Sequence, residues 1–215
     1  MSPLPFSSLG DLAQSMLASM EAKDRAREEA LRLSRQAVRS CSKAIRSLHR
    51  GNPADSDRLI KEARESLDSI EEILADHQDV RHAGFVDDAE QEYAEARNLL
   101  AMIASLEILS PAETGVELAN YLAGLGDAAG ELRRHILNLI RGGRPEEGLG
   151  YLEMMEEIYH LLMLFDYPDA ITRGLRRKSD LARSMVERTE GDLTAALEMR
   201  KVAASMRLLE DKLKG

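Results

Sequence analysis

Residues 121–134 read Tyr121-Leu-Ala-Gly-Leu-Gly-Asp-Ala-Ala-Gly-Glu-Leu-Arg-Arg134, and they predict the middle of a long helix. Around this stretch, apolar residues recur every three or four positions, the spacing that places side chains along one face of an α-helix. These residues are Leu118, Leu122, Leu125, Ala129, Leu132, Ile136 and Leu139. We therefore expect this face to pack in the core of the protein.

Two acidic residues, Asp127 and Glu131, lie on a different face of the same predicted helix. Because they are four positions apart, both carboxylates project in one direction, more than about 90° away from the apolar face. Glycines stand around them, although each glycine costs a helix interior roughly 1 kcal/mol relative to alanine. They are Gly124, Gly126 and Gly130. This pattern indicates that a neighbouring helix, a metal ion or a substrate backbone approaches closely.

The composition is typical of long helices. The chain has 215 residues, of which 44% are hydrophobic but only 4% aromatic, and it contains no tryptophan. Ala, Leu, Glu, Arg and Met are abundant, which favours helices over strands. We predict an all-α fold in one helical domain spanning residues 1–215. Residues 1–10, which contain two prolines and three serines, are expected to form a loosely ordered lead-in.

Helical segments are predicted along most of the chain, separated by glycine, proline and polar breaks. They span about residues 12–49, 55–76, 86–109, 112–141, 145–164 and 175–212. The polar segment 77–84 is expected to be a loop. No segment shows the alternating pattern of a half-buried strand.

Charge and cysteine content limit the possible functions. A formal net charge of −9 argues against nonspecific attraction of the whole surface to nucleic acid or to anionic membranes. Cys41 is the only cysteine, so it forms no intramolecular disulfide, and we interpret it as a packing residue. Residues 1–20 do not resemble a signal peptide, and the most apolar run, residues 99–106, is far shorter than the roughly 20 residues of a membrane span. We expect a cytoplasmic protein without membrane contact.

The first helical segment carries a row of cations. No acidic residue occurs between Glu29 and Asp55, and the basic residues in this interval are three or four positions apart. On a helix they cover an arc of about 80° over about 27 Å. This cationic face consists of Arg32, Arg35, Arg39, Lys43, Arg46 and Arg50. Unpaired cations so close together repel one another, whereas a solvated face usually mixes both signs. We interpret it as a surface for nucleic acid or another polyanion, with a solvated face as the alternative.

A second acid pair, Glu92 and Glu95, lies in the segment 86–109. Glu92 falls inside the apolar arc of this predicted helix, where a carboxylate needs a cation, a hydrogen-bond donor or a metal ion to offset its desolvation. In an antiparallel bundle, this pair can meet Asp127 and Glu131, and converging carboxylates suit Mg²⁺ or Mn²⁺. Because the chain has 38 acidic residues, such spacings also arise by chance on a solvated surface.

The two acid-bearing segments together resemble the translin/Trax family, specifically its nuclease-type Trax branch. Gln91-Glu-Tyr-Ala-Glu-Ala96 is similar to the family pattern Gln-Glu-Tyr-x-Glu-Ala, and Asp127-Ala-Ala-Gly-Glu-Leu132 is similar to Asp-x-x-Gly-Glu-Leu. Residues 165–170 and 174–183 resemble archaeal members of the family. The resemblance implies an α-superhelical bundle of about seven helices and a hollow homo-oligomer, commonly an octamer. It also implies binding of single-stranded RNA or DNA inside that shell and Mg²⁺-dependent endoribonuclease activity.

The resemblance implies roles for individual residues as well. Glu92, Glu95, Asp127 and Glu131 would be the catalytic residues and the ligands of Mg²⁺, or of Mn²⁺ in its place. The cationic face would hold RNA phosphates through salt-dependent contacts that are largely independent of base sequence. Noncatalytic translins lack the complete acid set, so its presence favours a nuclease.

Two alternatives remain at this point. The first is a translin-like shell that binds single-stranded RNA or DNA without cutting it. The second is a structural adaptor in which the acids pair with Arg133, Arg134 or Arg183. The histidines are not spaced as metal ligands, so we interpret His135, one turn beyond Glu131, as a residue of the helix surface.

Overall fold

The structure is a computed structural model that describes residues 6–105 and 107–214. Within these ranges it contains nine α-helices, one 3₁₀-helix and no strand, so the predicted all-α fold is confirmed. The long helices are α1 (Phe6–His49), α2 (Pro53–Leu74), α4 (Phe85–Ser105), α6 (Leu118–Arg141), α7 (Leu149–Met163) and α9 (Leu175–Lys214). The single turns are α3 (Gln78–Arg81), α5 (Pro111–Thr114), α8 (Asp169–Thr172) and the 3₁₀-helix η1 (Pro145–Gly148).

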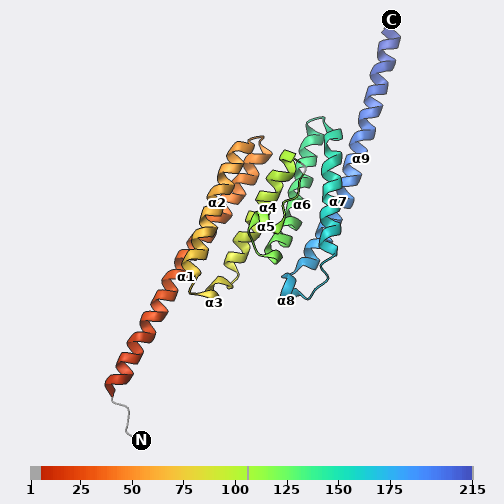
Figure 1. Ribbon diagram of the computed structural model, residues 1–215. Coiled ribbons are helices and arrows are strands. Elements are labelled where there is room, and N and C mark those ends of the chain that lie inside the picture. Colours follow the sequence, from red (N-terminus) through yellow and green to blue (C-terminus); the bar gives the residue numbers. More distant parts are fainter. Residues whose placement is uncertain (1–5, 106, 215) are drawn as a thin grey trace.

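The long helices form two groups of three that meet where α4 packs against α6 (Figure 1). Helices α1, α2 and α4 pack together on one side, and helices α6, α7 and α9 pack together on the other. The contact between α4 and α6 is called the seam below. The fully buried side chains of α4 include Leu99 and Met102, and those of α6 include Leu125 and Leu132. The seam therefore holds the two groups together.

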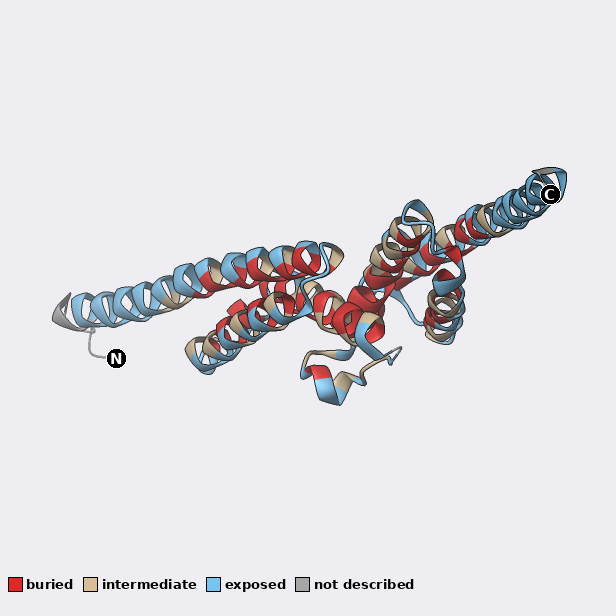
Figure 2. Cartoon of the chain, turned by 90° about the horizontal axis from the view of Figure 1, so that it is seen from above, coloured by how far each residue is buried: buried red, intermediate tan, exposed pale blue. Residues whose placement is uncertain are grey.

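Both ends of the described chain extend beyond this core in opposite directions (Figure 1). The N-terminal arm (residues 9–25 of α1) and the C-terminal arm (residues 198–213 of α9) are almost entirely exposed, as Figure 2 shows. Large apolar side chains nevertheless lie on both arms, a feature typical of interaction surfaces. They include Leu9, Leu12, Met16, Leu17 and Met20 on α1, and Met199, Val202, Met206, Leu209 and Leu213 on α9. Neither arm, nor any other described helix, is both long and apolar enough to cross a membrane.

The apolar face predicted on the central helix is buried, with one exception. Leu118, the first residue of α6, is exposed, whereas the other six residues of this face are buried. The chain does not enter α6 as a continuous helix from residue 112. Instead α5 ends at Gly115, whose φ of 66° lies in the left-handed region that glycine adopts without steric cost.

Other helix boundaries also differ from the prediction, among them the start of α1 and the end of α4. Helix α1 begins at Phe6, so part of the expected lead-in is helical, while residues 1–5 lie outside the described part of the chain. Helix α4 ends at Ser105, before the predicted Leu109, whose backbone is bonded to side chains of α4 and α6. Its N–H donates to Asn98 Oδ1 at 3.0 Å, and its carbonyl accepts from the Tyr121 hydroxyl at 2.6 Å.

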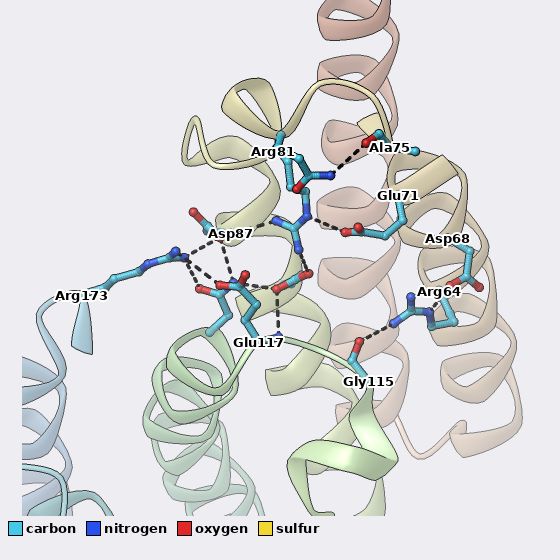
Figure 3. A network of polar contacts seen from close by, with 12 residues as sticks. Arg64, Asp68, Glu71, Ala75, Arg81, Asp87, Gly115, Glu117 and Arg173 are labelled. Carbon is cyan, nitrogen blue, oxygen red and sulfur yellow. Dashed lines mark hydrogen bonds and ion pairs between the residues drawn. The ribbon is translucent and has the colours of Figure 1, made fainter. Parts of the chain in front are cut away.

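The segment 77–84, expected to be a polar loop, instead contains α3 and a buried arginine. Arg81 is only 6% exposed, and its guanidinium contacts Glu71 of α2 at 2.6 Å and Glu90 of α4 at 2.5 Å. From the segment between α8 and α9, Arg173 contacts Asp87 of α4 at 2.5 Å (Figure 3). A buried charge is tolerated only when it is paired in this way. The network therefore fixes one end of the seam.

Candidate functional site

The four acids lie on facing sides of the seam. Glu92 and Glu95 project from α4, Asp127 and Glu131 project from α6, and all four are partly buried. They are close enough for the negative charges of Asp127 and Glu131 to raise the pKa of both α4 carboxyls. The structure therefore brings together two acid pairs from distant parts of the sequence. Gln91, next to Glu92, donates a hydrogen bond to Asp127, which is 36 positions away.

The glycines of α6 allow helices to approach it closely from two sides. A β-carbon at Gly124 would lie 2.9 Å from the backbone nitrogen of Glu95 and would overlap the carbonyl oxygen of Gln91. A β-carbon at Gly126 would lie 3.3 Å from Cβ of Lys178 in α9. Of the three partners that the sequence allowed, a neighbouring helix is therefore the one present at these glycines.

Burial and like charge raise the pKa of both α4 acids. For Glu95, desolvation is the larger cause and the charge of Glu92 follows, so that the pKa rises to about 8. For Glu92, burial is again the first cause and the charge of Asp127 the second. The same two glutamates, after burial, raise the pKa of the Cys41 thiol on α1, which is fully buried. Negative charge is thus concentrated at the seam, and a cation there would be stabilised.

Asp127 is held by a lysine that the sequence did not assign to the site. Lys178 Nζ, at the start of α9, donates to both carboxylate oxygens, at 2.5 and 2.6 Å. Gln91 Nε2 donates to one of them at 2.7 Å. Lys178 is 51 positions from Asp127, so no local spacing connects them. The arginine pairs of the adaptor alternative are mostly absent from the described contacts, because Arg133 bonds to Asp192 and Arg183 to Glu187.

Glu131 is held by a histidine that the sequence analysis also missed. His49 Nε2, at the end of α1, lies 2.5 Å from Glu131 Oε2, and Arg134 makes a longer contact of 3.4 Å. The bond from His49 is the main cause that lowers the pKa of Glu131. The only sequence signal for His49 is its position about 60° around α1 from Arg46, between the cationic face and the apolar face.

His135 is not the surface residue that we expected. Its ring is partly buried and packs edge-on against Tyr151, with ring centroids 4.7 Å apart. Its centroid lies 6.4 Å from that of His49. Burial, followed by the charge of His49, lowers the pKa of His135. His135 therefore lies near the histidine that holds Glu131 and packs against Tyr151.

The four acids are ligands of the type that a hard divalent cation prefers, but their carboxylates do not surround a single metal position. Among the described residues, no group of three or more His, Cys, Asp or Glu side chains is arranged to hold a metal ion. Carboxylate oxygens are nevertheless the ligands that Mg²⁺ and Mn²⁺ prefer. The four residues therefore match such an ion in chemical type, while in the described arrangement Lys178 occupies both oxygens of Asp127. These residues are Glu92, Glu95, Asp127 and Glu131.

The cationic face of α1 is exposed along its whole length. Arg32 bonds to Glu29 at 2.6 Å, so the expectation of an entirely unpaired row is wrong at this position. Within the described residues the other five cations form no ion pair. Because His49 lies at the edge of this face and contacts Glu131, the face borders the seam at the C-terminal end of α1.

Comparisons with known proteins agree on one family. The model of the Translin family matches residues 25–200. An uncharacterized protein of Methanocaldococcus jannaschii is 31% identical over 189 residues, which cover 87% of this chain and 84% of the relative. The crystal structure of AfC3PO is 33% identical, with a TM-score of 0.75 over 88% of this chain and 97% of that one. The AfC3PO complex with duplex RNA has the same identity and coverage and a TM-score of 0.74. The crystal structure of apo-NeC3PO, 24% identical, covers 91% of this chain and 100% of its own with a TM-score of 0.73, a likeness in fold alone.

Proposed function

This chain belongs to the Translin family, and on that premise we propose that it binds single-stranded RNA and cleaves it as a Mg²⁺-dependent endoribonuclease inside a hollow homo-oligomer. The observation that carries the proposal is that four carboxylates lie along the seam, beside the exposed cationic face of α1. AfC3PO, 33% identical to this chain, forms a complex with duplex RNA, which supports RNA as the class of ligand.

The cationic face supplies the affinity for RNA. Arg and Lys side chains that contact phosphates release condensed counterions, so binding of this kind weakens as salt rises and depends little on base sequence. Arg46 and Arg50 lie at the end of the face nearest to His49 and Glu131. A strand that follows the face in this direction reaches the carboxylates at the seam.

The carboxylates supply the chemistry of cleavage. Glu92, Glu95, Asp127 and Glu131 would hold Mg²⁺ or Mn²⁺, which when bound activates water and stabilises charge on the scissile phosphate. Burial and neighbouring negative charge raise the pKa of both Glu92 and Glu95, and a bound cation would offset that negative charge. His49 and Gln91 keep Glu131 and Asp127 in fixed orientations.

The two arms support assembly from identical subunits. Both carry exposed apolar side chains that nothing within the described part of one subunit covers. The N-terminal arm has three acidic and two basic residues, and the C-terminal arm has four basic and three acidic ones, so their formal net charges are −1 and +1. Opposite charge on two apolar helices favours contact between the N-terminal arm of one subunit and the C-terminal arm of another. We propose that the oligomer contains eight subunits.

One observation favours a second candidate, a translin-like shell that binds RNA or DNA without cutting it. Asp127 and Glu131 already have basic partners, Lys178 and His49, within the protein itself. In this candidate the four acids are structural, and the RNA-binding face of α1 is unchanged.

The experiment that separates the candidates is cleavage of end-labelled single-stranded RNA with Mg²⁺, Mn²⁺ or EDTA. We expect metal-dependent cutting by the wild type and none by Glu92→Gln, which should still bind RNA. Glu157→Gln, which changes an exposed glutamate of α7, is the matched control and should cut normally. RNA that is bound but intact under every metal would identify the noncatalytic shell, and absence of RNA binding would identify the adaptor. Duplex RNA and single-stranded DNA, tested in parallel, define the substrate class.

A further inference from the structure

Asp127 is fully engaged by the protein's own side chains. Lys178 Nζ lies within hydrogen-bonding distance of both of its oxygens, at 2.5 and 2.6 Å, and Gln91 occupies one of them as well. The two side chains of the ion pair are partly shielded from water, with 24% of Lys178 and 31% of Asp127 exposed. A cation placed symmetrically across a carboxylate in this way occupies the position that a metal ion would take.

The fold fixes Lys178 in this position. Leu175, one turn before it, and Ala182, one turn after it, are buried against the rest of the protein, so the same face of α9 turns toward α6. Gly126, next to Asp127, has no side chain and lets Cβ of Lys178 approach the α6 backbone. The neighbouring cations Arg176 and Arg177 are exposed and make no ion pair among the described residues. Of the three consecutive basic residues 176–178, Lys178 is therefore the one that pairs with Asp127.

We propose that Lys178 is a built-in counter-ion of Asp127, and that a divalent cation gains Asp127 as a ligand only by displacing the Lys178 ammonium. The inference rests on the proposed function and adds a regulatory step to it.

The displaced ammonium needs a new partner. The lysine side chain is a flexible four-carbon stem with a compact charge, so after displacement it stays near the seam. A phosphate of the bound RNA is an anion of the kind that this ammonium accepts. RNA should therefore favour metal binding by offering Lys178 a replacement for Asp127, and metal should favour RNA binding by the same factor.

The test compares Lys178→Met with Arg177→Met in the full chain. Both variants remove one positive charge from the same turn of α9, but only the first removes the partner of Asp127. Binding of Mn²⁺ is measured by isothermal titration calorimetry, with and without a single-stranded RNA whose backbone resists cleavage. We expect Lys178→Met to bind Mn²⁺ about tenfold more tightly than Arg177→Met, and RNA to raise Mn²⁺ affinity in Arg177→Met but not in Lys178→Met.

The outcomes separate this proposal from the proposed nuclease activity. Equal Mn²⁺ affinity in the two variants would overturn the counter-ion role while leaving a metal-dependent nuclease intact. Tight Mn²⁺ binding by Lys178→Met, in a protein whose wild type neither binds the ion nor cuts RNA, would support the counter-ion role and overturn the nuclease. Absence of Mn²⁺ binding in every variant would overturn both. Should Lys178→Met not fold, Lys178→Gln keeps a donor for Asp127 without the charge, and it should also bind Mn²⁺ more tightly than Arg177→Met.

Discussion

The imidazole Nε2 of His49 lies 2.5 Å from the carboxylate Oε2 of Glu131, although 82 positions separate the two residues in the sequence. The contact joins the end of α1 to the middle of α6, helices that belong to different groups of the fold. The His49 side chain is only 4% exposed, and that of Glu131 is 25% exposed. A carboxylate at the candidate site is therefore oriented by a residue of the same helix that carries the cationic face.

Replacing His49 should weaken the fold as well as release Glu131. We expect His49→Ala to lower the free energy of unfolding by about 1–3 kcal/mol at pH 7, because a partly buried carboxylate loses its main partner. The pKa of Glu131 is lowered in the folded protein, so its contribution is present above the unfolded value and is lost as pH falls through the folded value. Urea unfolding should therefore show a smaller difference between the two proteins below about pH 4. His160→Ala, at an exposed histidine of α7, is the control. Equal losses in both variants would contradict a specific role for His49.

The contribution of Glu95 to the free energy of unfolding depends on pH in the opposite direction to that of Glu131. Its pKa is raised to about 8 in the folded protein, so the folded state keeps a proton that the unfolded state loses near its ordinary value. Stability in EDTA should therefore fall as pH rises from about 5 to about 8. Glu95→Gln, which resembles the protonated acid, should remove part of this decline and be more stable than the wild type at pH 8 by on the order of 2 kcal/mol. Thermal melting at pH 5 and pH 8 measures the effect. A wild-type curve that stays flat over this range would show that Glu95 ionises normally.

The sequence was sufficient to predict the features that depend on the local spacing of residues along a helix. The apolar face of α6 and the exposed cationic face of α1 follow from residues three or four positions apart, which a helix places on one side whatever surrounds it. The acid pairs were predicted for the same reason. The assignment of these acids as catalytic residues and metal ligands came from the family resemblance, and it remains a prediction.

The partners of the acids were not predictable, because they come from distant elements. His49 and Lys178 reach the seam only once α1 and α9 have packed on opposite sides of it. The burial of Arg81 within a polar segment has the same cause, since Glu71 and Glu90, which offset its charge, come from α2 and α4. Local polarity indicates exposure only when no such partners converge.

Charge reversal on α1 tests whether the cationic face binds RNA. The double variant Arg39→Glu, Arg46→Glu should weaken RNA binding, and the slope of log affinity against log salt should decrease by about 1–2, because two phosphate contacts are lost. Both residues are exposed and form no ion pair among the described residues. The control is Arg58→Glu, Lys61→Glu, which makes the same change in net charge on the exposed face of α2. Fluorescence anisotropy at several salt concentrations provides both quantities. Unchanged affinity in the α1 variant would return that face to the solvated interpretation.

The close packing at the seam makes Gly124 a position where even a methyl group is costly. Gly124→Ala gains roughly 1 kcal/mol of intrinsic helix stability, as alanine does over glycine in any helix interior. Its β-carbon, however, would overlap the Gln91 carbonyl oxygen and lie 2.9 Å from the Glu95 nitrogen, and these are backbone atoms that cannot rotate away. Relief requires α4 and α6 to separate, which also loosens the core residues between them. We therefore expect a net loss of about 1–3 kcal/mol in the free energy of unfolding, measured by urea denaturation.

Gly191→Ala is the matched control for this substitution. Gly191 is also inside a helix, but a β-carbon there would meet nothing within 4 Å. This variant should show the intrinsic effect alone and gain about 0.5–1 kcal/mol. Opposite signs at the two positions would attribute the loss at Gly124 to the contact between α4 and α6. A gain in stability at both positions would mean that the seam can open without cost, and the acids it aligns would then not be rigidly placed.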